Sequence, residues 1–214
     1  MAQPQLWAEA SRRLLDFTAE RLPEMDRFGL DVQVLSLNSP GIQAEPEAAV
    51  AVRAALAVND LLASVIGDHP DRFRGFAALP LQDRAATADE LERAVTQLGL
   101  AAGLVNAHTN GEYLDDPDFS VVWERAAGLG VPIYLHPANS VDTVHVLSGH
   151  PELVGPMWSW GVDTSTHALR PGWPAVSRRP RGSAAARHAR PTVPLARVSG
   201  TKRGRTGRSK RGAS

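Results

Sequence analysis

Four short apolar runs, each followed by a helical pattern, constrain the fold of this chain more than any other feature. Strands that alternate with helices form a parallel sheet, because each helix carries the chain back to the end where the next strand begins. The residues alone leave two architectures open, an open doubly wound sheet and a (β/α) barrel. The four runs predicted as strands are residues 31–37, 73–79, 101–107 and 131–136.

Helical patterns precede and separate these runs. A helix is predicted over residues 7–28, where Pro23 is expected to bend or divide it. No Gly-x-Gly-x-x-Gly follows the first strand and no other Gly-rich phosphate loop occurs, which disfavours a dinucleotide-binding sheet. The remaining predicted helices cover residues 46–66, 83–98, 116–128 and about 151–169.

The charge of the chain is divided sharply between two parts. Its 23 acidic residues all lie within residues 1–170, whereas residues 171–214 carry 12 basic residues and no acidic one. The second part is rich in Arg, Pro, Gly and Ser and lacks apolar periodicity, so we predict a disordered tail. The sequence therefore predicts a folded unit at 1–170 and a basic tail at 171–214, and the abrupt change raises the hypothesis that the tail is translated out of frame.

The tail could in principle bind nucleic acid, because its run Lys202–Arg205 could neutralise phosphates. No aromatic residue follows Trp173 and no nucleic-acid-binding motif is present, so an accidental basic peptide is the favoured interpretation. The chain has no cysteine, which excludes disulfides, thiolate catalysis and Cys-ligated zinc. No secretory signal and no run of about 18 apolar residues is recognised, so we expect a soluble, cytoplasmic protein without a membrane partner.

Chemistry in parallel α/β folds gathers at the carboxyl ends of the strands. His136 precedes Pro137 at such an end, a rigid support that suits a metal ligand, since neutral imidazole is the commonest one. A histidine that only packs or hydrogen-bonds at the rim is the more frequent outcome for a single His. The other residues at predicted strand ends are Asn38, Pro80, Asn106 and His108.

Other side chains are weaker candidates. His145 and His150 are expected to be solvated, and His167 is expected on a helix surface. Trp158 and Trp160 either line an aromatic substrate pocket or pack in the core. No His-x-His, Glu-x-His or His-Glu-x-x-His occurs, although a catalytic zinc takes three protein ligands. No Gly-x-Ser-x-Gly elbow supports a serine hydrolase.

A family resemblance is carried by four longer segments, residues 12–43, 59–83, 98–137 and 149–170. These segments resemble the amidohydrolase-related family, in the branch of 2,6- and 2,3-dihydroxybenzoate decarboxylases and aminocarboxymuconate semialdehyde decarboxylase. The resemblance implies a (β/α)8 barrel, a divalent zinc or manganese ion, and loss of carbon dioxide from a small aromatic carboxylate. His136, in Tyr-Leu-His-Pro, matches the family's metal-ligand position on the fifth strand, and Asn38 and Asn106 are substrate-pocket candidates.

The chain also departs from the family pattern. It lacks the Glu-x-His or His-x-His pair of the first strand, the Gly-His-Met-Gly-like segment and the Thr-Asp-Trp-like motif, and the resemblance ends at residues 166–170. The resemblance therefore implies an incomplete barrel, with strands two to five and their helices, followed by the disordered basic tail. We assign no catalytic residue and expect that this chain neither retains the metal nor turns over substrate.

Two alternatives stay open. One is a metal-dependent hydrolase of the amidohydrolase superfamily, because the motifs that would distinguish the reaction types are missing. The other is a non-catalytic remnant or interaction protein that pairs its open sheet edges with another chain. Self-association is also left open.

Overall fold

The computed structural model describes residues 4–139 and 145–177. Its centre is one four-stranded parallel sheet with the order β1-β2-β3-β4, as predicted. Leu104 lies beside Tyr134 in the register of β3 and β4, and Asn106 lies beside His136. The first strand is shorter than the predicted run 31–37. The strands are β1 (Gln33–Leu35), β2 (Phe73–Ala78), β3 (Ala102–Asn106) and β4 (Ile133–His136).

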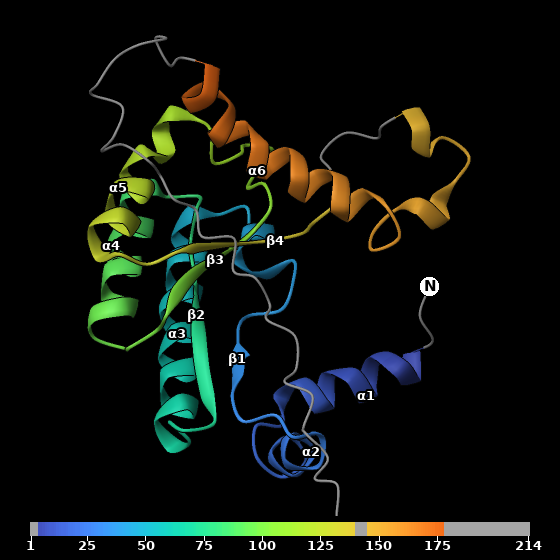
Figure 1. Cartoon of the computed structure of the whole chain (residues 1–214), viewed down its shortest axis with the longest axis vertical. Helices are drawn as coiled ribbons and strands as arrows, with labels where there is room; N and C mark the ends of the chain where they lie inside the picture. The colour runs from blue at the N-terminus through green and yellow to red at the C-terminus, as the bar shows by residue number, and fades with distance from the viewer. Residues whose placement is uncertain (1–3, 140–144, 178–214) are drawn as a thin grey trace, which may run out of the picture.

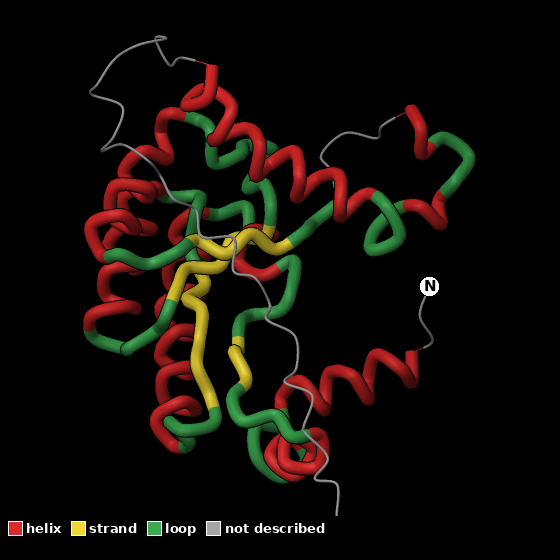
Figure 2. The backbone as a smooth tube through the Cα atoms, in the orientation of Figure 1, coloured by secondary structure: helices red, strands yellow, loops and turns green. Residues whose placement is uncertain are grey.

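Three helices cover one face of this sheet, as Figures 1 and 2 show. They are α3 (Ala48–Asp68), α4 (Arg84–Thr96) and α5 (Ser120–Leu129). The strand residues that face them are small or apolar, so the helices approach closely. At Gly75, an added Cβ would come within 3 Å of side-chain atoms of Ile66, Leu62 and Leu100. The core between the sheet and the helices includes the fully buried Phe73, Leu79, Leu91, Val105 and Phe119.

The opposite face of the sheet is open. The side chains of Val34 and Tyr134 are 49% and 42% exposed, and the ring of Phe76 lies 5.3 Å from that of Tyr134. In a closed barrel this face would be the packed interior. The sheet curls as half a barrel, so apolar side chains such as Val34 and Tyr134, which would lie inside a closed barrel, are exposed here.

The N-terminal helical region divides at a different place from the one predicted. Helix α1 (Pro4–Leu15) and helix α2 (Arg21–Phe28) are separated at Asp16, whose carboxylate accepts hydrogen bonds from the backbone N–H groups of Glu20 and Arg21. Pro23 lies in the first turn of α2, where no intrahelical partner for its missing N–H is needed. A capping carboxylate, rather than the proline, therefore sets the break.

The C-terminal helix is also shifted from its predicted position. Residues 151–169 were predicted as one helix, but α6 begins at Ser159 and runs to Ser177, past the predicted domain boundary at Arg170. Residues 171–177 therefore continue a helix instead of starting a structureless tail, and the prediction for residues 178–214 lies outside the described residues. Short 3-10 segments cover Gly41–Ala44 (η1), Pro117–Phe119 (η2), His145–Leu147 (η3) and Pro151–Leu153 (η4).

Helix α3 corrects a further prediction. Among the described residues, α3 alone is long and apolar enough to match a membrane span by length and composition, contrary to the expectation that no stretch would. In the fold it packs on the sheet: Ala51 and Ala55 are fully buried, and Asn59 is hydrogen-bonded to the backbone of Ala78 in β2. Its Ala-rich composition suits close packing against strands.

Candidate functional site

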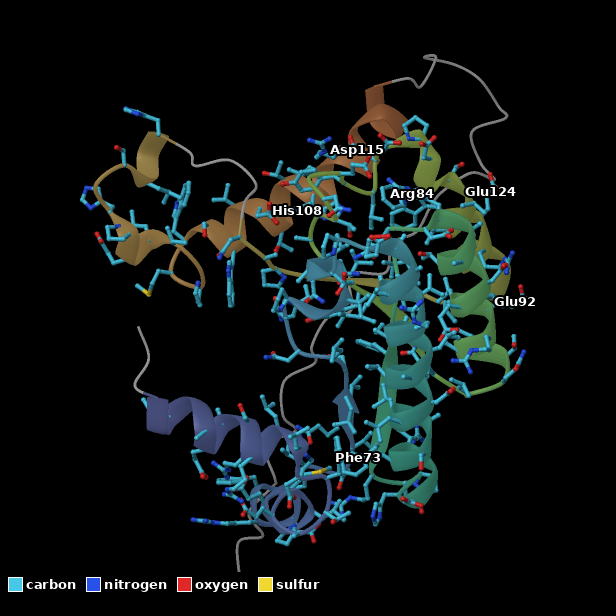
Figure 3. The ribbon with its side chains drawn as sticks, turned by 180° about the vertical axis from the view of Figure 1, so that it is seen from behind. Phe73, Arg84, Glu92, His108, Asp115 and Glu124 are labelled. Atoms are coloured by element: carbon cyan, nitrogen blue, oxygen red, sulfur yellow. The ribbon has the colours of Figure 1, made fainter. Side chains whose placement is uncertain are left out.

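The carboxyl ends of β3 and β4 bring two of the predicted site residues together. Asn106 closes β3 and His136 closes β4, and the two are direct neighbours in the parallel register. Helix α6 crosses this end of the sheet, while α1 and α2 lie at the other end (Figure 1). Figure 3 shows His108 and Asp115 close to α6 at this end, and Phe73 near the opposite end.

His136 has the geometry of a ligand with one free nitrogen. Its Nδ1 lies 2.8 Å from the carbonyl oxygen of Pro137. A carbonyl only accepts, so Nδ1 carries the proton and Nε2 keeps its lone pair. Metal-binding histidines commonly donate their second ring N–H to a backbone carbonyl in this way. The half-buried ring is 6.3 Å from the ring of Trp160, so an aromatic side chain borders it.

Asn106 is held in a buried row of amides. Its Nδ2 donates to Oε1 of Gln43 at 3.1 Å, and Nε2 of Gln43 donates to the carbonyl oxygen of Leu79 at 2.9 Å. Gly41 makes this approach feasible: it has a positive φ of 63°, and an added Cβ would lie 2.5 Å from Nδ2 of Asn106. The Oδ1 atom of Asn106 is buried without a partner in the described part of the chain, so it remains available to a donor.

Asn38 and Pro80 do not join this row. Asn38 is exposed beyond the end of β1 and makes no hydrogen bond to any described residue. Pro80 is buried, and its carbonyl oxygen accepts from the hydroxyl of Thr87 at 2.7 Å. Gln43 was not predicted as a site residue, because an isolated glutamine in a loop gives no signal of its position in space.

His108 bonds to the neighbouring loop instead of facing a free space. Its Nε2 lies 3.1 Å from the carbonyl oxygen of Asn139, so Nε2 is the donor. Asn139 in turn accepts from the indole N–H of Trp160 at 2.9 Å. The two predicted tryptophans therefore have different surroundings. Trp160 borders the ring of His136, whereas Trp158 is half-buried. As expected, His145 and His150 are exposed.

The prediction for His167 was wrong. It is fully buried instead of lying on a helix surface, and its Nε2 accepts from the backbone N–H of Leu114 at 3.1 Å. Burial lowers the pKa of His167 to about 4, although Asp163 opposes this shift. The pattern of α6 did not show this because the surface that covers His167, the loop around Tyr113, comes from a distant part of the sequence.

A complete metal centre is not present in the described part of the chain. No group of three or more His, Asp or Glu side chains there is arranged to hold an ion. A catalytic metal takes three protein ligands, so the described residues by themselves do not supply a full ligand set.

Comparisons with known proteins identify the family to which this half barrel belongs. Residues 5–189 match the family described as Amidohydrolase. The chain belongs to this amidohydrolase family. It is 43% identical over 174 residues to gamma-resorcylate decarboxylase of Rhodococcus jostii (strain RHA1), covering 77% of this chain and 53% of the relative. It is 34% identical over 123 residues to 2-amino-3-carboxymuconate-6-semialdehyde decarboxylase of Dictyostelium discoideum, covering 56% and 34%.

Solved structures of decarboxylases are also similar to this chain. A 2,6-dihydroxybenzoate decarboxylase complexed with 2,6-dihydroxybenzoate superposes with a TM-score of 0.76 at 40% identity, covering 80% of this amidohydrolase chain and 55% of the other. The dihydroxybenzoic acid decarboxylase of Polaromonas sp. JS666, solved with bound manganese and 2-nitroresorcinol, superposes with a TM-score of 0.75 at 40% identity, covering 79% and 53%. The chain therefore spans about half the length of the relatives it matches.

Proposed function

We propose that this chain is the part of a metal-dependent aromatic-acid decarboxylase that carries strands two to five of the barrel. The observation that carries the proposal is the pair at the end of β3 and β4: His136 with Nδ1 tied to a carbonyl and Nε2 free, beside a buried Asn106 with a free amide oxygen. Relatives of this half barrel act on dihydroxybenzoate and hold manganese.

In this proposal the residues have distinct roles. His136 offers Nε2 as one ligand of a divalent ion, zinc or manganese, which when bound supplies a Lewis acid. Asn106 presents Oδ1 to a hydroxyl of a small aromatic carboxylate, and Gln43 fixes the orientation of its amide. Trp160 gives the pocket an aromatic wall beside His136. Asn38 would reach the substrate only from the exposed loop after β1.

The described residues do not fit a complete metal site, so no catalytic step is assigned to them. One imidazole cannot hold a divalent ion against hydration, and the open face of the sheet admits water where a decarboxylase pocket excludes it. We therefore infer that the described residues alone support no turnover and that a complete site needs further ligands beyond them.

The reaction class is tested in a whole barrel. Residues 12–170 replace the matching segment of the Rhodococcus jostii gamma-resorcylate decarboxylase, and carbon dioxide release from 2,6-dihydroxybenzoate is measured after manganese loading. We expect release that falls more than about 100-fold in His136→Ala. The matched control is His145→Ala, which removes an exposed histidine away from the strand ends and should leave the rate unchanged. A folded, metal-loaded chimera that hydrolyses amides but releases no carbon dioxide would favour the hydrolase alternative.

A further inference from the structure

Helix α6 is fastened to the loop between β3 and α5 by three polar contacts from one side of the helix. Oδ1 of Asp163 accepts from the Tyr113 hydroxyl at 2.9 Å, and Nε2 of His167 accepts from the backbone N–H of Leu114 at 3.1 Å. One turn further along the helix, Arg170 donates to Asp115 at 2.8 Å. These residues are spaced at i, i+4 and i+7, so they share one face of the helix.

Two of these three contacts involve buried side chains of α6. His167 is fully buried and Asp163 is 4% exposed, whereas the Arg170 to Asp115 pair is partly solvated and worth little by itself. The ring of Tyr113 packs edge-on against the His167 imidazole, with centroids 5.0 Å apart. The Arg170 guanidinium lies 4.6 Å from the centre of the same Tyr113 ring. The docking of α6 therefore depends chiefly on His167 and Asp163.

The hydrogen bond to Leu114 exists only while the imidazole is neutral. A backbone N–H donates to Nε2, so Nε2 must be unprotonated and the single proton sits on Nδ1. Protonation of Nε2 would leave two N–H groups facing each other and would place a cation in a buried site. Within the described residues, Nδ1 of His167 and Oδ2 of Asp163 have no hydrogen-bond partner. The imidazole is therefore held by the single hydrogen bond from Leu114.

We propose that His167 is a proton-sensitive latch: the neutral imidazole holds α6 against the loop between β3 and α5, and protonation of the imidazole releases the helix. Release would also withdraw Trp160, on the same helix, from Asn139 and from the ring of His136. The latch thus couples the pH of the surroundings to one wall of the candidate site.

The electrostatic surroundings set the pH range of the latch. Burial lowers the pKa of His167 to about 4 from its usual 6.5, with Asp163 and Asp115 opposing the shift and Arg170 and His108 adding to it. Because the docked pKa lies below that of the released histidine, docking is complete above about pH 6.5 and weakens as the pH falls toward 4. With a pKa of 6.5 for the released histidine, the equilibrium constant for docking of α6 is about 30-fold lower at pH 5 than at pH 7.5.

The experiment is amide hydrogen exchange of the full 214-residue chain between pH 7.5 and 5, corrected for intrinsic exchange, with a parallel NMR titration of the His167 ring. We expect exchange in α6 to rise about 30-fold while α3 and α4 stay protected. In His167→Gln the amide oxygen still accepts from Leu114 but cannot titrate, so α6 should stay docked at pH 5. His150→Gln, which changes an exposed histidine paired with Glu152, is the matched control and should behave as the original chain.

A second variant tests the role of the neighbouring charge. Asp163→Asn keeps an acceptor for Tyr113 but removes the negative charge that favours the imidazolium, so the pKa of docked His167 should fall further and acid should release α6 at least as strongly as in the original chain. The latch is overturned if α6 exchange does not change between pH 7.5 and 5, or if α3 opens together with α6. If His167→Gln does not fold, the titration of the unaltered chain decides: a His167 midpoint near 6.5 without any change in α6 contradicts the proposal.

Discussion

Replacing Asn59 by Ala should destabilise this half barrel severely, because one buried amide joins three elements. Its Nδ2 donates to the carbonyl oxygen of Ala78 at 3.0 Å and to Oε1 of Glu90 at 2.7 Å, and its Oδ1 accepts from the N–H of Ala78 at 2.8 Å. The side chain thus links α3 to β2 and to the buried carboxylate of α4. Asn59 is fully buried, so water cannot replace these contacts.

The magnitude follows from the three bonds. Each of the two neutral bonds to the backbone contributes about 1 kcal/mol, and the bond to the ionised Glu90 contributes about 2 kcal/mol. The carboxylate keeps its contacts with Arg93, at 2.7 and 2.9 Å, so no fully unpaired charge is added. The sum is a loss of about 4 kcal/mol, a large part of the stability that a domain of this size has.

Urea unfolding followed by circular dichroism measures this loss. With a slope of about 2 kcal/mol per molar urea, the midpoint should fall by about 2 M. Asn38→Ala is the matched control, because Asn38 is exposed and unbonded in the described part of the chain, and it should change stability by less than about 0.5 kcal/mol. A loss below about 1 kcal/mol in Asn59→Ala would show that the buried amide does not join these elements.

Two further predictions concern stability. Gly41→Ala should destabilise the chain by about 2 kcal/mol, because the positive φ of Gly41 and the close approach of Asn106 both exclude a Cβ. Gly128→Ala, in α5 with open space around it, should stabilise the chain by about 0.5 kcal/mol. Thermal unfolding of the two variants checks these opposite signs, and equal effects would contradict the role of Gly41. Trp123→Phe should cost about 1 kcal/mol by removing the 2.8 Å indole bond to the carbonyl oxygen of Leu114, and an unchanged urea midpoint would rule that contribution out.

The strand–helix alternation made the sheet predictable. Each strand run is apolar and ends at a breaker, and local patterns of this kind depend only on neighbouring residues, so the parallel order of the four strands followed directly. The position of His136 at the end of its strand followed in the same way. The break between α1 and α2 did not, because a side-chain cap at Asp16 competes with the more obvious proline signal at Pro23.

Long-range contacts explain what the sequence did not predict. His167 has a polar helical neighbourhood, and only the docking of α6 on the Tyr113 loop buries it. Gln43 becomes part of the site only because the turn at Gly41 brings it to Asn106, more than sixty residues along the chain. Pairings of this kind depend on tertiary structure, which leaves no periodic signal in either segment.

The most direct test of the account is to measure the metal content of the purified 214-residue chain after loading with manganese or zinc and dialysis, together with carbon dioxide release from 2,6-dihydroxybenzoate. Because no group of three metal-binding side chains is found among the described residues, we predict far less than one ion per chain and no release. One ion retained per chain, with turnover that His136→Ala abolishes, would contradict the account and show that the chain builds a complete site.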